Sequence, residues 1–181
     1  DDVATGTIEA NAVKAVTFAN AYDVKPVTAS GADHFKGAKL LEGDRGWLDT
    51  DSFTFSISSE GAAPLPAETT KTILGADVLD PDSEVNPDEE GWVPFAFGDV
   101  EYTKPGVYTY LITEESPAVA LPGMSYSNAG YQVVVTVTDN HDGTMSVTSE
   151  MSQLGGDEGQ EGSGPVADKT ARFTNSFSLS T

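Results

Sequence analysis

Apolar and polar residues alternate with a period of two through much of this sequence, which is the side-chain period of β-strands and not of helices. No segment has a convincing helical period. Turn-forming residues such as Asp139–Gly143 separate the alternating stretches, which cover residues 53–57, 107–114, 131–138 and 145–151. Short strands separated by turns at regular intervals predict an all-β sandwich.

The last strand-like segment, Ala171–Phe177, carries a polar residue on its apolar face. With a period of two, its odd-numbered positions share one face, and Asn175 lies between two phenylalanines on it. Lys39 and Glu114 lie on the apolar faces of two other predicted strands in the same way. We therefore expect an amine, a carboxyl group and a carboxamide in the interior of the sandwich.

These three residue types form a reactive set when they are buried together. An apolar pocket is expected to lower the pKa of Lys39 and to raise the pKa of Glu114, which favours a neutral amine beside a carboxylic acid. The acid can polarise the carbonyl of Asn175 and pass protons to the leaving ammonia while Lys39 attacks. The product is a side-chain isopeptide bond, and the reaction occurs once per molecule. Glu114 would be the catalytic residue, but the protein would not be an enzyme.

Each residue also has a simpler interpretation. Lys39 could be a surface lysine whose stem covers the core, Glu114 a solvated strand-end carboxylate, and Asn175 a hydrogen-bonded core amide. Lys36 is a rival nucleophile, but it lies an odd number of positions from Lys39 and is predicted to face the other way. Glu115, the next residue along the chain, could be confused with Glu114.

Four separated motifs resemble the pilin isopeptide-linkage repeat of Gram-positive surface proteins. They are Lys39–Gly43 followed by Phe53–Phe55, then Pro105–Glu114, Tyr131–Asn140 and Phe173–Phe177, in order and spread over roughly residues 33–178. The resemblance implies an immunoglobulin-like sandwich of the collagen-adhesin B type (CnaB). It also implies a bond between Lys39 and Asn175 with Glu114 assisting. The sequence departs from the family pattern at residues 44–47 and in the acidic stretch 77–90, and neither departure includes these three residues.

A near copy of the closing strand occurs near the start of the chain. Thr17–Tyr22 matches Arg172–Phe177, with Asn20 and Asn175 separated by 155 positions, a spacing that suits tandem domains. We interpret residues 1–22 as the closing strand and linker of a preceding module, and residues 23–181 as the isopeptide module. Lys25–Gly31 is interpreted as linker, and Asn20 is expected to remain unreacted because its lysine would lie in the preceding module.

The charge balance excludes several classes of partner. The chain has 29 acidic and 9 basic residues, a net charge of −20, and no cysteine. Nucleic acid and anionic membrane surfaces need clustered cations, so neither is expected as a partner. We expect no cofactor and no metal site. The acidic stretch 77–90 has oxygen ligands of the kind that Ca²⁺ uses, but a solvated loop is the favoured interpretation.

The resemblance implies a structural role outside the cell. We expect a stalk or pilus module at the cell wall whose partners are neighbouring tandem modules of the same surface protein. The cross-link is expected to join the first and last strands of the module. The alternative is an adhesin domain that binds a carbohydrate or a host matrix protein through Trp47, Trp92 or the acidic stretch.

Overall fold

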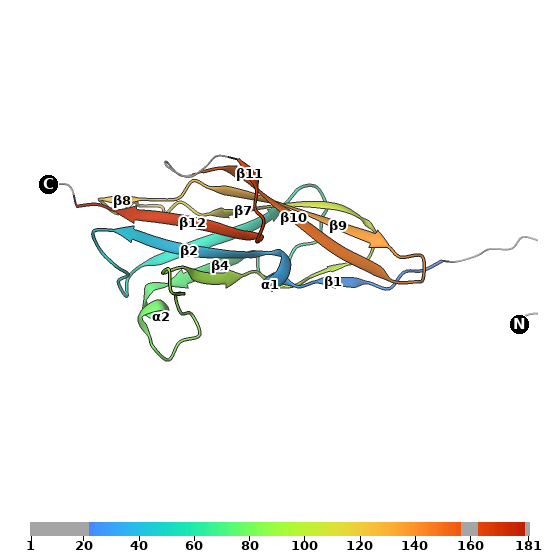
Figure 1. Cartoon of the computed structure of the whole chain (residues 1–181), viewed down its shortest axis with the longest axis horizontal. Helices are drawn as coiled ribbons and strands as arrows, with labels where there is room; N and C mark the ends of the chain where they lie inside the picture. Colours follow the sequence, from blue (N-terminus) through green and yellow to red (C-terminus); the bar gives the residue numbers. More distant parts are fainter. Residues whose placement is uncertain (1–21, 157–162, 180–181) are drawn as a thin grey trace, which may run out of the picture.

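The computed structural model describes residues 22–156 and 163–179 of the chain. In this part the chain is almost entirely β-strand, and Figure 1 shows an elongated sandwich with the N- and C-terminal ends at opposite poles. A six-stranded sheet and a four-stranded sheet enclose the core, and β1 (Val27–Ala29) and β6 (Val100–Tyr102) form a separate two-stranded ribbon. The predicted all-β sandwich is confirmed.

The six-stranded sheet has the order β11-β10-β9-β7-β3-β4 and is antiparallel throughout. Its central strands are the ones in which the sequence alternates, and their inward positions are buried. The bounds are β3 Ser52–Ser59, β4 Thr70–Leu74, β7 Gly106–Glu114, β9 Gly130–Asp139, β10 Met145–Gly155 and β11 Gly164–Pro165.

The four-stranded sheet has the order β5-β2-β12-β8. Its strands are β2 Lys36–Gly43, β5 Val93–Ala96, β8 Met124–Ser125 and β12 Thr170–Phe177. The strands β2 and β12 run parallel, in a register that places Lys39 beside Phe173 and Leu41 beside Asn175. Lys39 and Asn175 therefore lie two positions apart along neighbouring strands, on the same face of the sheet.

Aromatic side chains fill the space between the two sheets. Phe55 from the six-stranded sheet stacks on Phe95 at 4.2 Å between ring centroids and packs against Phe173. Tyr131 meets Phe173 edge to face, and the Tyr131 hydroxyl donates a hydrogen bond to the Arg172 carbonyl oxygen at 2.5 Å. These contacts fix the two sheets relative to each other around the strands that carry the polar core residues.

The start of the module differs from the sequence prediction. The interpretation of residues 25–31 as linker is wrong, because Val27–Ala29 forms β1 and Gly31–His34 forms the short helix α1. A Cβ on Gly31 would lie 1.8 Å from the carbonyl oxygen of Phe97, so α1 packs where only glycine can be placed. Since β1 precedes β2, Lys39 lies on the second strand of the module and not on the first.

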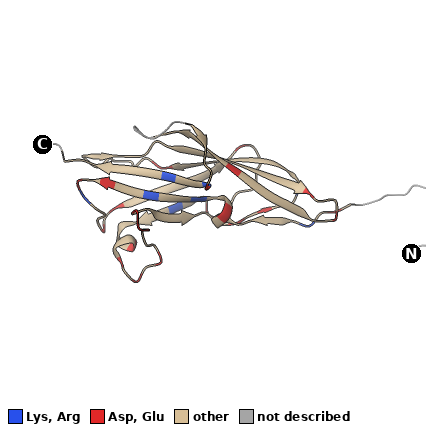
Figure 2. Cartoon of the chain, viewed as in Figure 1, with Lys and Arg blue, Asp and Glu red and all other residues tan. Residues whose placement is uncertain are grey.

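A second short helix, α2 (Gly75–Leu79), overlaps the start of the acidic stretch, which continues as a loop to β5. Figure 2 shows acidic residues distributed along the molecule, while the strands β2, β12 and β4 carry basic residues. No helix in residues 22–156 and 163–179 is long and apolar enough to cross a membrane.

Candidate functional site

Three strands bring Lys39, Glu114 and Asn175 together between the sheets. Lys39 projects from β2 and Asn175 from β12 in the four-stranded sheet, while Glu114 projects from the end of β7 in the six-stranded sheet. Lys39 and Asn175 are fully buried, and the Glu114 side chain is 1% exposed. The sequence prediction that these polar residues face the core agrees with their burial.

Glu114 bridges the other two side chains through its two carboxyl oxygens. Oε2 accepts a hydrogen bond from Lys39 Nζ at 2.7 Å, and Oε1 accepts one from Asn175 Nδ2 at 2.6 Å. The amine and the carboxamide therefore contact the same carboxyl group, which can exchange protons with both. A shared acid-base group next to a nucleophile and an acyl group is the arrangement that amide exchange needs.

A fourth group, which the sequence analysis missed, completes the site. The backbone N–H of Ser127 donates a hydrogen bond to Asn175 Oδ1 at 2.7 Å. Because a backbone N–H can only donate, this contact fixes the orientation of the carboxamide, with Oδ1 toward Ser127 and Nδ2 toward Glu114. The sequence analysis expected Glu114 to contact the carbonyl oxygen; in the structure it contacts the amide nitrogen instead. A main-chain donor in a loop leaves no signature in residue type or spacing.

Apolar groups surround the lysine amine. Nζ of Lys39 lies 4.6 Å from the centroid of the Phe53 ring. On the sheet its backbone neighbours are Phe173 and Val93, both completely buried. The low polarity of these neighbours strengthens every charge interaction at the site and makes full ionisation of the pair costly.

The two rival residues lie outside this site. Lys36 is half-buried and lines a surface cavity on the opposite face of β2. Glu115 is exposed, and its backbone N–H pairs with the Thr54 carbonyl oxygen. The predicted orientation of Lys36 is confirmed, and Lys36 and Glu115 provide matched controls for Lys39 and Glu114.

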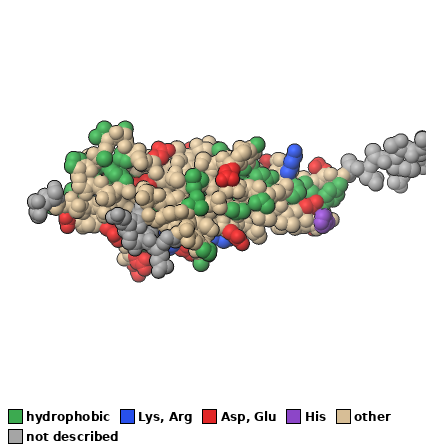
Figure 3. Space-filling view, turned by 90° about the horizontal axis from the view of Figure 1, so that it is seen from above, with side chains coloured by type: hydrophobic (Ala, Val, Ile, Leu, Met, Phe, Trp, Pro, Cys, Tyr) green, Lys and Arg blue, Asp and Glu red, His purple; other side chains and the backbone are tan. Residues whose placement is uncertain are grey.

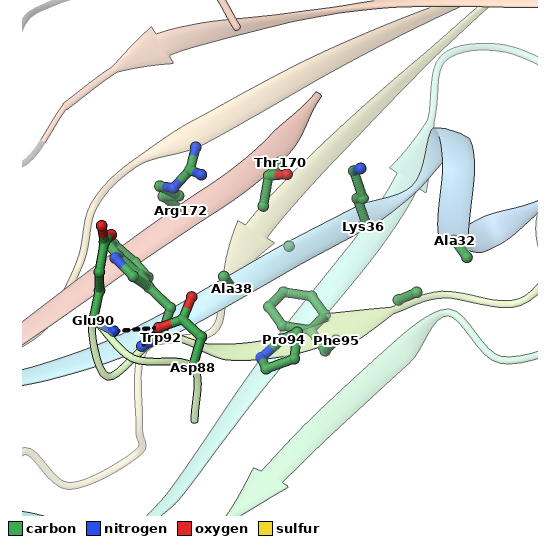
Figure 4. Close-up of a pocket in the computed structure, with 12 residues that line it drawn as sticks. Ala32, Lys36, Ala38, Asp88, Glu90, Trp92, Pro94, Phe95, Thr170 and Arg172 are labelled. Carbon is green, nitrogen blue, oxygen red and sulfur yellow. Dashed lines mark hydrogen bonds between the residues drawn. The ribbon is translucent and has the colours of Figure 1, made fainter. Parts of the chain in front are cut away.

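The other candidates from the sequence do not form a single site. Trp47 is half-buried and packs edge to face on Phe53, with 5.3 Å between ring centroids. Trp92 lies in a surface cavity of about 430 Å³ together with Asp88, Glu90 and Arg172 (Figure 4). In the described ranges, no three carboxylate or histidine side chains converge in a way that could hold a metal ion.

A lysine, a glutamate and an asparagine buried together between the sheets of a β-sandwich are what the resemblance to pilin isopeptide domains implies, and comparison with known proteins agrees with that resemblance. Residues 35–178 match the FctA family, described as the Spy0128-like isopeptide-containing domain. The chain belongs to this family. The predicted resemblance to a Gram-positive pilin isopeptide domain is confirmed.

A solved pilin structure shares the fold at low sequence identity. The major pilin T-13 of Streptococcus pyogenes is 15% identical, with a TM-score of 0.51, and the match covers 85% of this chain and 54% of the pilin. Another major pilin of Streptococcus pyogenes is 21% identical, with a TM-score of 0.49, and the match covers 80% of this chain and 50% of the pilin. The chain thus spans about half the length of these pilins. No curated protein sequence matches it.

Proposed function

We propose that this chain is a structural module of a Gram-positive pilus or surface stalk, reinforced by a Lys39–Asn175 isopeptide bond that forms autocatalytically with Glu114. Membership of the pilin-type isopeptide family supports a structural role in a pilus. The observation that supports the cross-link is the pair of hydrogen bonds that Glu114 accepts from Lys39 and Asn175 in a site sealed from solvent.

The first step moves a proton within the Lys39–Glu114 pair. The hydrogen bond between Nζ and Oε2 is short, and an ion pair buried beside Phe53 is costly. Transfer of a proton from the ammonium to the carboxylate converts the pair into a neutral amine and a carboxylic acid. The amine then has a free lone pair and can act as a nucleophile.

In the second step Nζ of Lys39 attacks Cγ of Asn175. Negative charge develops on Oδ1, and the Ser127 N–H that already binds this oxygen stabilises it, as an oxyanion-hole donor does. Glu114 takes a proton from the attacking nitrogen and delivers one to Nδ2, which it already contacts. The bond from Cγ to Nδ2 breaks and ammonia leaves. One proton stays on the new amide nitrogen, ammonia carries three, and the last remains on Glu114.

Intact mass spectrometry tests this reaction directly. The mass of the purified protein is expected to be lower than the sequence mass by one ammonia, and peptide mapping should find the residue-39 and residue-175 peptides joined. Lys39→Met and Glu114→Gln should abolish the deficit, whereas the neighbouring control variants Lys36→Met and Glu115→Gln should keep it. A wild-type protein with the full sequence mass would refute the proposal.

The proposed setting is the outside of the cell, with other modules of the same surface protein as partners. A cross-link between β2 and β12 suits a module that transmits tension, because these two strands lie side by side and the described part of the chain begins and ends at opposite poles (Figure 1). With no cysteine in the sequence, a disulfide cannot supply this reinforcement.

The cavity at Trp92 favours a second candidate function, adhesion to a glycan or a host matrix protein. Trp92 forms one wall, Arg172 lies 5.7 Å above its ring, and Asp88 and Glu90 supply carboxylates (Figure 4). Aromatic and planar polar side chains of this kind can hold a sugar. The wild type should bind on glycan or matrix-protein arrays, and Trp92→Ala should lose that binding, if the module is an adhesin. A wild type that binds neither array would rule out this second function.

A further inference from the structure

We propose that three aromatic side chains, Trp47, Phe53 and Tyr126, form a partition that decides which nucleophile Asn175 meets. By keeping water out of the site, this aromatic partition directs the amide to the lysine amine and prevents its hydrolysis. The inference deepens the proposed cross-linking and rests on it.

Phe53 contacts the reactive amine and a surface cavity at the same time. The centroid of its ring lies 4.6 Å from Lys39 Nζ, and its side chain is buried on β3. Phe53 also lines a cavity of about 380 Å³. Glu115 and Ser116, which line the same cavity, are exposed, so solvent reaches it. The Phe53 ring is therefore a wall between the amine and water.

Two further rings hold Phe53 in place. Trp47 packs on it edge to face, with 5.3 Å between ring centroids. Tyr126 packs against it at 6.5 Å and lines the cavity as well. Tyr126 directly precedes Ser127, whose N–H binds Asn175 Oδ1. The aromatic partition thus extends from the amine to the segment that holds the carboxamide.

A buried carboxylate fixes the loop that carries Trp47. The Asp51 side chain is 2% exposed and accepts two hydrogen bonds from the Arg45 guanidinium, at 2.7 and 2.9 Å. It also accepts the N–H of Leu48 at 2.8 Å. This loop includes residues 44–47, where the sequence departs from the family pattern. The departure therefore supplies the ring that supports the outer side of the partition.

A water molecule in the site would find both partners and a catalyst. Buried water typically makes about three hydrogen bonds, and Glu114 and Asn175 offer polar atoms for them. Water could then attack Cγ of Asn175 while Glu114 takes one of its protons and delivers one to Nδ2. The Cγ–Nδ2 bond breaks, ammonia leaves, and the side chain becomes a carboxylic acid that the amine can no longer use. Closed sites prevent side reactions of this kind by excluding water.

Hydrolysis of Asn175 can be measured without the competing amine in Lys39→Met, which keeps the apolar stem of the side chain. Intact mass and peptide mapping should find asparagine at position 175 after prolonged incubation. Adding Phe53→Ala should convert it to aspartate. Adding Glu114→Gln to that double variant should slow the conversion by about a hundredfold, because the acid-base group is lost. A purely structural role of Phe53 would not make the conversion depend on Glu114.

Phe97→Ala in the Lys39→Met background is the matched control. Phe97 is as well buried as Phe53, at 5% and 4% exposed, but lies four positions along the chain from Val93, the strand neighbour of Lys39. Its removal should leave the asparagine intact. Phe97→Ala that yields aspartate as fast as Phe53→Ala would overturn the proposal.

Trp47 provides a second variant at a half-buried position. In the same background, Trp47→Ala should also give aspartate at position 175, and Trp47→Phe should restore protection. If neither Phe53→Ala nor Trp47→Ala yields aspartate, the partition proposal is overturned. The ammonia deficit of the wild type reports separately on the cross-link, so a deficit without hydrolysis in these variants would refute the partition alone.

Discussion

The sharpest perturbation of the proposed cross-link is Glu114→Gln. The two side chains have nearly the same shape, so the variant should fold. However, a carboxamide can neither take the proton of Lys39 nor return one to Asn175 Nδ2. We expect the protein to keep its full sequence mass. Asn175→Ala removes the acyl group instead and should also leave the chain without a cross-link.

The expected loss of stability follows from the length of the loop that the bond closes. Lys39 and Asn175 are 136 positions apart in the sequence. In the chain-entropy treatment of cross-links, a loop of this length stabilises the folded state by about 5 kcal/mol. For a domain of this size, that loss of stability lowers the thermal unfolding midpoint by roughly 10–20 °C. Glu114→Gln should lower the free energy of unfolding by somewhat more than loss of the bond alone, because it leaves the buried Lys39 amine without its acid partner.

Intact mass and chemical unfolding should be measured on the wild type, both single variants and the double variant. Since the bond can be lost only once, the double variant should be destabilised by much less than the two single effects added together. The control variant Glu115→Gln should show the same ammonia deficit and the same unfolding midpoint as the wild type. A Glu114→Gln protein that still loses ammonia would refute the catalytic role of Glu114. If a variant without the bond has a free energy of unfolding within about 1 kcal/mol of the wild-type value, the entropic argument is refuted.

Two further predictions concern groups near the cross-link. Ser127→Pro removes the N–H that binds Asn175 Oδ1 and should slow bond formation in freshly refolded protein, whereas Ser127→Ala keeps the N–H and should react like the wild type; a time course of intact mass distinguishes them. Burial opposes ionisation of Asp51, but hydrogen bonds from Arg45 and from Leu48 N–H outweigh it and lower its pKa. The ionised Asp51 carboxylate should stabilise the fold fully above about pH 4, and this stabilisation should be lost as the pH falls through the lowered pKa of Asp51. In thermal unfolding, Asp51→Asn should therefore reduce the loss of stability at acid pH.

The sequence predicts the strands that carry the core better than it predicts the edges. Alternation is strong in β3, β7, β9 and β12 because each buries one face and exposes the other. The same rule places Lys39, Glu114 and Asn175 inward, since a period of two decides which face a residue occupies. Polar residues on an otherwise apolar face were therefore the informative signal.

The missed features are those that depend on tertiary contacts. β1 has only three residues, too few for a period, and exists because it pairs with β6. The donor at Ser127 is a main-chain group whose position depends on how the loop before β9 crosses the end of β12. The interpretation of residues 1–22 as part of a preceding module remains a prediction, because residues 1–21, including Asn20, lie outside the described ranges.

The parallel pairing of β2 and β12 decides which part of the module a pulling force can extend. Tension enters near Tyr22 and leaves after Leu179, at opposite poles of the sandwich (Figure 1). With the bond in place, force passes from residues 22–39 through the side chains of Lys39 and Asn175 to the last few residues. The 135 residues between the cross-linked positions carry no load. Residues 22–38, however, lie ahead of the bond, so β1 and the first part of β2 can still be pulled away.

Single-molecule stretching should therefore separate two lengths. At about 3.5 Å per residue, the wild type should lengthen by at most about 70 Å, as β1 leaves β6 and Lys36–Ala38 leave β12. Asn175→Ala should lengthen by on the order of 500 Å in one unfolding event, because nothing then protects the loop. On the face shown in Figure 3, the exposed apolar side chains form small scattered groups. A wild type that shows the ammonia deficit and still extends by the longer length would refute this load path.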